Sequence, residues 1–421
     1  MSKKLGNKIA IIVGGGPAPG INGVISAATI EAIALGMTVI GISGGFKSLF
    51  DGNRGCVIPL TIDEVSRIHT QGGCILRTSR EYPERVKEKF RVLMSTLKKI
   101  GATHLLTIGG EGTLFMANWI EKESRGSISV VHVPKTIDND IPLPGGVSTF
   151  GYQTARHWGV EIVENIMEDA KTTGRWYFIT TMGRHTGHLA LGIGKASGAT
   201  ISLIPEEFEG ETLSFKQVAD ILTCSILKRL SMHKDHGVAI LGEGIAEKFD
   251  MEELARYEQL ENDETGGIRL SEIQLGRVMK NFVKKTLESM GIRVTIVDKN
   301  IGYELRAANP IPYDVEYTRN LGYGAVHYLH KGGTGAMIVV YEGRLIPVPF
   351  VELIDHVTGK VKIRTVDINS ETYTVGRKYM IRLEREDFSP QNLKRLAKSA
   401  NLNTSEFRDR FGYLVGPPEM W

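Results

Sequence analysis

Residues 9–22 read IAIIVGGGPAPGIN, a short apolar run that ends in glycines and then opens a helical pattern. Glycine lets the backbone approach a phosphate closely, and the helix N-terminus behind it offers free N–H donors and a positive dipole end. The spacing fits neither GxGxxG nor GxxxxGK[ST], which excludes a standard dinucleotide or Walker loop. The stretch therefore predicts a strand, a turn and a helix, and the turn either binds a phosphate or carries no ligand.

The same rhythm of short apolar runs and longer periodic segments extends along most of the chain. Strands are expected at Ile9–Val13, Thr38–Ile42, His104–Ile108, Ser129–Val133, Trp176–Thr181, Val238–Leu241, Arg293–Val297 and Ala336–Tyr341. Helices are expected at Asn22–Ala34, Glu84–Ile100, Thr154–Ala170, Ser271–Ser289 and Val315–His330, and a surface loop at Glu258–Gly267. Such alternation favours mostly parallel sheets covered on both faces, whose ligands lie at the carboxyl ends of strands. After about residue 342 the segments look shorter and more β-like, followed by a charged helical pattern at Ser389–Ala400.

Length and composition indicate a globular protein with an excess of glycine. A chain of 421 residues is long for one domain, so two or three compact units are expected. Hydrophobic residues make up 42% and charged residues 24%, which permits a substantial core. Glycine accounts for 48 of the 421 residues, about 11% against a usual ~7%. A net charge of +3 without a Lys/Arg block excludes a strongly basic nucleic-acid binder.

The cysteines and the N-terminus indicate a reducing compartment. Cys56, Cys74 and Cys224 form no CxxC pair and no cluster with zinc spacing, so inert thiols are expected. The chain begins without a signal-peptide pattern, and no apolar stretch approaches the ~20 residues that span a bilayer. We therefore predict a cytoplasmic protein without a membrane partner.

Two further strands end in loops suited to phosphate chemistry. The third predicted strand ends in Gly109-Gly110-Glu111-Gly112-Thr113, where a carboxylate among glycines suits Mg²⁺ shared with phosphate oxygens. Alternatively, Glu111 only interacts with the helix dipole. The fourth strand ends in Pro134-Lys135-Thr136-Ile137-Asp138-Asn139-Asp140, where a carboxylate can accept a proton and the lysine can neutralise a transferring group. The alternative for this loop is a solvated polar turn, but three such loops after three strands favour a site.

Other candidates lie later in the chain. Met182-Gly183-Arg184 and Gly242-Glu243-Gly244 each follow a strand, and Tyr303-Glu304-Leu305-Arg306 precedes a Pro-Ile-Pro turn. Guanidinium groups clamp phosphates well. The arginines considered for this role are Arg80, Arg175, Arg184, Arg293 and Arg306; each alone could equally be a surface residue or a structural ion pair.

Together these motifs resemble the phosphofructokinase family, in matching order from about residue 8 to residue 345. The segments that carry the resemblance are Ala18–Asn22, Gly109–Thr113, Pro134–Asp140, Met182–Arg184 and Pro310–Asp314. The resemblance implies two Rossmann-like αβα domains with mostly parallel sheets and the active site in the cleft between them. We expect a phosphoryl-donor domain at residues 1–150 plus 304–355 and a sugar-phosphate domain at 151–303 plus 356–421.

The resemblance also implies roles for individual residues in the phosphorylation of fructose 6-phosphate to fructose 1,6-bisphosphate in glycolysis. Asp138 would be the base for the sugar C1 hydroxyl, with Lys135 and Arg184 as further catalytic groups. Sugar-phosphate contacts would come from Thr136, Ile137, Met182, Gly183, Arg184, Glu243, Tyr303 and Arg306. Arg175 and Arg293 would reach across a subunit interface in a homodimer or homotetramer. Gly16, Arg80, Gly110, Glu111, Gly112 and Thr113 match the donor-phosphate region, with Glu111 as the Mg²⁺ ligand where the family more often has aspartate.

The phosphoryl donor is either ATP or pyrophosphate. In pyrophosphate-dependent members an acid typically fills the space of the ATP α-phosphate; here that position is Gly112. Lys135, by contrast, is typical of pyrophosphate users. Because an added carboxylate repels an α-phosphate whereas a lysine repels neither donor, the glycine favours ATP. We therefore expect an atypical ATP-dependent member of the pyrophosphate-type branch.

Two functions of other classes are disfavoured. A regulatory subunit that binds sugar phosphate without catalysis is disfavoured because the base and the metal carboxylate, Asp138 and Glu111, are intact. A nicotinamide-dependent dehydrogenase is suggested only by the glycine-rich turns and is disfavoured by the absence of GxGxxG. Sedoheptulose 7-phosphate stays open as a second sugar substrate.

Overall fold

The computed structural model describes residues 7–80, 83–208, 210, 212–250 and 273–416. The chain divides into two compact units, each built from two stretches of sequence. Unit 1 comprises Met1–Ala155 with Tyr303–Arg364, and unit 2 comprises Arg156–Gly302 with Thr365–Trp421.

Unit 1 contains a mixed sheet that is parallel at its centre. Its strand order is β12-β11-β5-β4-β1-β2-β3, and the short β6 continues the pairing of β5. Only the edge strands β3 and β12 run antiparallel to their neighbours among the described pairs. The strands are β1 (Lys8–Val13), β2 (Thr38–Ile42), β3 (Val57–Pro59), β4 (His104–Gly109), β5 (Ser129–Thr136), β6 (Phe150–Gly151), β11 (Ala336–Tyr341) and β12 (Arg344–Pro349).

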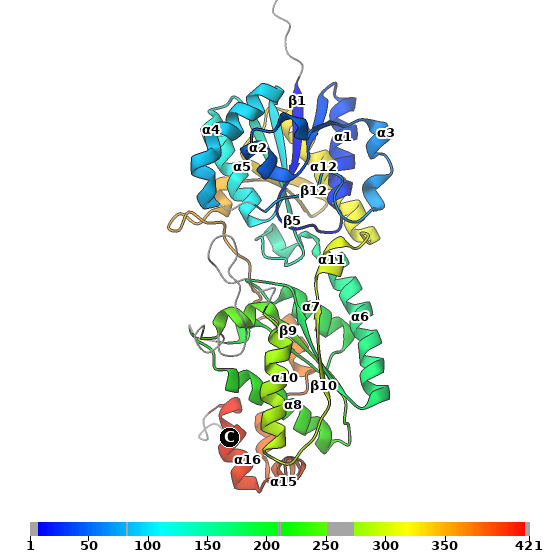
Figure 1. The fold of residues 1–421 in the computed structure, drawn as a ribbon, viewed down its shortest axis with the longest axis vertical. Coiled ribbons are helices and arrows are strands. Elements are labelled where there is room, and N and C mark those ends of the chain that lie inside the picture. Colours follow the sequence, from blue (N-terminus) through cyan, green and yellow to red (C-terminus); the bar gives the residue numbers. More distant parts are fainter. Residues whose placement is uncertain (1–6, 81–82, 209, 211, 251–272, 417–421) are drawn as a thin grey trace, which may run out of the picture. The chain divides into compact units, whose positions relative to one another are not determined.

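Helices cover both faces of this sheet (Figure 1). On β1, Ala10 and Ile12 pack with α2, α4 and α5, whereas Ile9, Ile11 and Val13 pack with α1 and α12. Because successive strand residues point to opposite faces, a strand covered on both sides is apolar throughout. The helices of unit 1 are α1 (Ile21–Ala34), α2 (Gly45–Phe50), α3 (Ile62–Val65), α4 (Pro83–Ile100), α5 (Glu111–Ser124), α11 (Tyr303–Ala307), α12 (Pro312–His330) and α13 (Phe350–Leu353).

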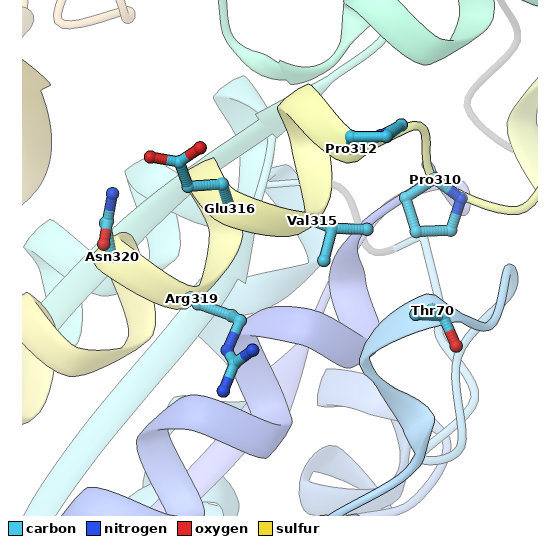
Figure 2. Close-up of a pocket in the computed structure, with 7 residues that line it drawn as sticks. All are labelled: Thr70, Pro310, Pro312, Val315, Glu316, Arg319 and Asn320. Carbon is cyan, nitrogen blue, oxygen red and sulfur yellow. The ribbon is translucent and has the colours of Figure 1, made fainter.

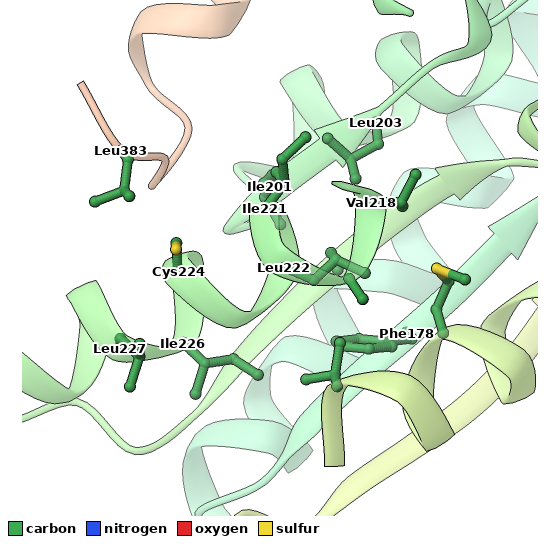
Figure 3. Close-up of a cluster of buried hydrophobic side chains, with 14 of the residues drawn as sticks. Phe178, Ile201, Leu203, Val218, Ile221, Leu222, Cys224, Ile226, Leu227 and Leu383 are labelled. Atoms are coloured by element: carbon green, nitrogen blue, oxygen red, sulfur yellow. The ribbon is translucent and has the colours of Figure 1, made fainter. Parts of the chain in front are cut away.

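Unit 2 contains a parallel sheet of order β10-β7-β9-β8. Its strands are β7 (Trp176–Thr181), β8 (Ile201–Leu203), β9 (Gly237–Gly242) and β10 (Ile296–Ile301). Figure 3 shows the core between this sheet and α8, where Phe178 and Leu203 meet Leu222, and Leu383 approaches from the C-terminal segment. The helices are α6 (Tyr152–Thr173), which begins in unit 1, α7 (His188–Ser197), α8 (Phe215–Ser231), α10 (Leu275–Glu288), α14 (Glu371–Lys378), α15 (Pro390–Ser399) and α16 (Thr404–Phe411).

The two sheets with helices on their faces confirm the predicted α/β class. Every predicted strand has a counterpart, although the segment predicted at Arg293–Val297 forms its strand later, at Ile296–Ile301. The expectation of β-like segments after residue 342 holds for β12 alone, which is followed in the described residues by short helices, and the helical pattern predicted at Ser389–Ala400 forms α15. The predicted loop Glu258–Gly267 and the first residues of the predicted helix Ser271–Ser289 lie outside the described residues. An active site between the two domains stays a prediction.

None of the helices in the described ranges combines the length and the apolarity that crossing a bilayer demands.

Candidate functional site

Three of the predicted loops emerge side by side from unit 1. Strands β5, β4 and β1 are parallel neighbours, with Val13 paired to Ile108 and Gly109 paired to Pro134. Their carboxyl ends therefore share one edge of the sheet. The buried side chain of Thr113, in the first turn of α5, packs against both Gly14 and Gly109 and joins the first two loops. The structure thus brings together Gly16, Gly110, Glu111, Gly112, Thr113, Lys135, Thr136, Ile137 and Asp138 at this edge.

Lys135 is the buried cation of this edge. Its side chain is 5% exposed, and its ammonium donates a hydrogen bond to the carbonyl oxygen of Gly16. Burial lowers the pKa of Lys135 to about 8, helped by Arg306 and Arg80 and opposed by Asp138 and Asp140. Two acidic and two basic side chains therefore act on one ammonium group. Burial is the largest cause of the lowered pKa, and a bound anion beside the ammonium would favour its charged form.

Arg306 lies on the first glycine loop. A side chain on Gly16 would overlap the Arg306 guanidinium, whose Nε lies 3.4 Å from the carbonyl oxygen of Pro17. The guanidinium carbon is also 5.6 Å from the ring centre of Tyr303, which is 64% exposed. Arg80 is exposed and follows Ser79, which forms a bridge with Gly14. The close approach at Gly16 requires glycine and holds cationic groups over the turn.

The loop after β5 is held by its own polar groups. The N–H of Asp138 donates to Thr136 Oγ1 at 3.0 Å, and Asn139 adopts a left-handed backbone with φ of 59°. Ile137 is buried, which anchors the loop between the two polar residues that flank it. The carboxylate of Asp138 consequently sits on a tight turn at the sheet edge.

Oxygen ligands suitable for Mg²⁺ are present at the same edge. Glu111 is the first residue of α5, and Oδ1 of Asp140 is buried without a hydrogen-bond partner among the described residues. In the part of the chain that the structure describes, no cluster of three or more His, Cys, Asp or Glu side chains could hold a metal ion. Mg²⁺ usually keeps waters and takes only one or two carboxylates together with substrate phosphates. The residues present fit such an ion.

A second cluster forms in unit 2 at the carboxyl ends of β7 and β9. Oε1 of Glu243 accepts a hydrogen bond from the N–H of Gly183 at 3.0 Å, and Gly183 has φ of 135°, which favours glycine. Arg184 donates through Nε to Glu247 Oε1 at 2.9 Å. Burial raises the pKa of Glu247, but His185 and Arg184 outweigh it and leave that pKa lowered. Met182, Gly183, Arg184 and Glu243 are therefore brought together within one unit.

Arg175 and Arg293 lie at the other edge of the same sheet. Arg175 immediately precedes β7 and Arg293 precedes β10, whereas Arg184 follows β7. The six residues of β7 span about 20 Å at ~3.3 Å per residue. Within one chain these two arginines are thus separated from Arg184, and their predicted contribution from a neighbouring subunit stays a prediction.

A groove of about 500 Å³ lies elsewhere in unit 1 (Figure 2). It runs between α12 and the turn at Thr70. Its lining residues are Thr70, Pro310, Pro312, Val315, Glu316, Arg319 and Asn320. None of these residues belongs to the predicted site.

Several polar residues of the two clusters were missed from the sequence. Glu247 accepts a hydrogen bond from Arg184 and pairs with His185. In the other cluster, the hydrogen bond between Thr149 and Asn139 holds the loop of Asp138. Arg364 also binds that loop from a position 225 residues away. Glu247 could have been found from its spacing of four residues after Glu243, whereas no sequence signal links Arg364 to the loop.

The comparisons with known proteins agree on the family. The model of the family described as Phosphofructokinase matches residues 8–329. A pyrophosphate--fructose 6-phosphate 1-phosphotransferase of Thermotoga maritima is 50% identical, over 98% of this chain and all of that protein. One of Naegleria fowleri is 45% identical, over 97% and 95%, and an ATP-dependent 6-phosphofructokinase of Mycobacterium bovis is 32% identical, over 82% and 94%.

A solved structure shows the same fold. The pyrophosphate-dependent phosphofructokinase of Marinobacter aquaeolei superposes with a TM-score of 0.65, covering 98% of this chain and 92% of that one. At 15% identity this likeness concerns the fold alone. It confirms the predicted pair of Rossmann-like αβα domains.

The prediction that ATP is the phosphoryl donor is wrong. The two relatives at 50% and 45% identity, which match nearly the whole chain, are both named as pyrophosphate enzymes. Gly112 alone does not select ATP. A missing carboxylate removes one repulsion but supplies no contact for a nucleoside, whereas Lys135 has a fixed place on the glycine loop.

Family membership rests on sequence similarity along most of the chain. The family model spans residues 8–329, and relatives at 50% and 45% identity extend the match to nearly the full length. The predicted phosphotransferase class is confirmed with it. The chain belongs to the phosphofructokinase family.

Proposed function

We propose that this enzyme is a pyrophosphate-dependent fructose 6-phosphate 1-phosphotransferase. The observation that carries the proposal is the 50% identity, over 98% of the chain, to a Thermotoga maritima protein of that name. The geometry of unit 1 supports it, because Lys135, Arg80 and Arg306 gather positive charge at the glycine loops. Such a site suits a small, highly charged anion.

In this proposal Asp138 is the general base. Its carboxylate accepts the proton of the sugar C1 hydroxyl as that oxygen attacks the terminal phosphorus of pyrophosphate. The bond between this phosphorus and the bridging oxygen breaks, so that fructose 1,6-bisphosphate forms and inorganic phosphate leaves. A base positioned in this way typically contributes about 10²- to 10⁴-fold to the rate.

The cations and glycine loops bind the donor. The ammonium of Lys135, fixed by the Gly16 carbonyl, would face the phosphate oxygens together with Arg80. The backbone N–H groups at the start of α5, in Gly110–Thr113, would add uncharged donors. Donors that are already in place lose little reorganisation energy when charge shifts to the leaving phosphate.

Glu111, and Asp140 with its unpaired buried oxygen, are the candidates to hold Mg²⁺. When bound, the ion would neutralise charge on the pyrophosphate oxygens.

The sugar phosphate would bind to groups of both units. Thr136, Ile137, Tyr303 and Arg306 lie in unit 1, and Met182, Gly183, Arg184 and Glu243 lie in unit 2. Arg175 and Arg293 would join the site of a neighbouring subunit in a homodimer or homotetramer. A cytoplasmic location belongs to the same proposal.

The test is a donor comparison with the purified protein. Fructose 6-phosphate and Mg²⁺ are supplied with either pyrophosphate or ATP, and fructose 1,6-bisphosphate is measured in a coupled assay. We expect product with pyrophosphate and at least tenfold lower kcat/KM with ATP. Absence of product with pyrophosphate would refute the proposal.

A further inference from the structure

The backbone turns sharply just after the proposed base. Asn139 has φ of 59°, a left-handed conformation that only a few per cent of non-glycine residues adopt. Thr149 holds the near side of this turn, because its N–H donates to Asn139 Oδ1 at 3.0 Å and its hydroxyl donates to the Thr136 carbonyl at 2.9 Å. A conformation of this kind persists only where its surroundings impose it.

Arg364, the last residue of unit 1 in the sequence, binds the same turn. Its Nε donates to the carbonyl of Asn139 at 3.0 Å, its Nη1 donates to the carbonyl of Val147 at 2.8 Å, and its Nη2 donates to Asn139 Oδ1. Its backbone N–H also donates to the carbonyl of Asp140 at 2.7 Å. One residue thus binds the backbone carbonyls of both residues that directly follow Asp138.

The guanidinium suits this place by shape as well as by charge. It offers five donors in a rigid planar fork, so it can bridge Asn139 and Val147, which are eight residues apart in the sequence. Burial lowers the pKa of Arg364, and the nearby Asp140, Tyr152 and Tyr317 counteract this. Asp140 in turn acts on Lys135. The arginine is therefore coupled to the base loop by hydrogen bonds and to the donor site by charge.

We propose that Arg364 is a positioning residue that sets the direction of the Asp138 carboxylate. The inference rests on the proposed function, in which Asp138 is the base. Arg364 lies beyond residue 329, where the match to the family model ends, and it is the last residue of unit 1 before the chain passes into unit 2. Without its fork, the loop loses three hydrogen bonds, two at Asn139 and one at Val147.

The experiment measures kcat and both KM values for Arg364→Gln, Arg364→Lys and the control Lys362→Met. A misplacement of about 1 Å costs roughly 100-fold in rate, so kcat of Arg364→Gln should fall by about that factor while the KM values stay near those of the wild type. Arg364→Lys should recover only part of kcat. Its ammonium keeps the charge, but it cannot bridge both carbonyls. Lys362, two residues away, donates instead to the Glu352 carbonyl at 3.0 Å, and its replacement should leave kcat unchanged.

A second readout separates positioning from stability. Added guanidinium ion should raise kcat of Arg364→Ala, whereas an equal concentration of sodium chloride should not. If the wild type is active, two results would overturn the role of Arg364 but not the proposed function. These are an unchanged kcat in Arg364→Gln and a loss of kcat in Lys362→Met as large as that in Arg364→Gln. If Arg364→Gln does not fold, wild-type kcat in Arg364→Lys would overturn it in the same way. A wild type that forms no product from pyrophosphate would overturn the proposed function, and this role with it.

Discussion

The ammonium of Lys135 donates a hydrogen bond to the carbonyl oxygen of Gly16 and so links the end of β5 to the turn after β1. Strand β4 lies between these two strands, which means that the lysine reaches across a strand to the glycine loop. It is buried there beside Arg306, whose guanidinium covers Gly16. Two cations thus meet at one backbone turn, and this arrangement leads to two predictions.

Replacing Lys135 by methionine should weaken the use of pyrophosphate. The change keeps the length of the side chain but removes its charge and leaves the Gly16 carbonyl without its donor. Hydrogen bonds to charged groups contribute about 1.5–3 kcal/mol, so kcat/KM for pyrophosphate should fall by at least about 10- to 100-fold. Lys122→Met, on the exposed side of α5, is the matched control and should match the wild type. An equal kcat/KM in Lys135→Met would contradict the assignment.

The activity should depend on pH through Lys135. Burial lowers its pKa to about 8, so the free enzyme carries the cation below pH 8 and loses it as the pH rises above 8. The value of kcat/KM for pyrophosphate should therefore fall by up to about tenfold per pH unit above pH 8. Arginine stays protonated in this range, so Lys135→Arg should lack that fall.

Both enzymes are assayed in the same buffers, so that the ionisation of pyrophosphate itself affects them equally. Identical pH profiles for the wild type and Lys135→Arg would show that another group titrates.

The central strands and their loops could be predicted from the sequence because apolar runs and glycine turns are local signals. The missed strands β3, β6 and β8 have only two or three residues, too few to show periodicity. Strand β10 was placed too early because Asp298 and Lys299 interrupt its apolar pattern. Asp298 is tolerated there because it pairs with Lys280 of α10, a contact that depends on tertiary structure.

In the site, too, only the residues that stand in local motifs could be predicted from the sequence. Asp138, Lys135 and Gly183 stand in dense local motifs, whereas Arg364 reaches the site only through folding of a distant segment. The donor could not be read from the single position Gly112, because affinity for a nucleotide depends on contacts over a whole surface.

Replacing Gly183 by alanine should lower both stability and affinity for the sugar phosphate. Its φ of 135° strains any L side chain, and a Cβ would lie 2.5 Å from the Thr186 carbonyl oxygen. Backbone strain of this kind costs about 1–3 kcal/mol. Gly198→Ala is the matched control, since Gly198 also has positive φ but nothing lies within 4 Å of its Cβ position.

Thermal unfolding and KM for fructose 6-phosphate test this prediction. Gly183→Ala should show the lower Tm of the two. It alone should raise KM, because relief of the clash shifts the backbone N–H that donates to Glu243. Equal effects of the two substitutions would mean that the loop has no special role.

Replacing Asp138 by asparagine should remove the base while keeping the shape of the loop. The N–H of residue 138 still donates to Thr136 Oγ1, so the turn is retained. An amide cannot accept the C1 hydroxyl proton, and kcat should fall about 10²- to 10⁴-fold, with binding of fructose 6-phosphate by calorimetry largely unchanged. Asp63→Asn, an exposed acid on α3, controls for the loss of a negative charge. Near-normal turnover in Asp138→Asn would show that a different group takes the proton, whereas loss of sugar binding together with turnover would make Asp138 a binding residue instead of a base.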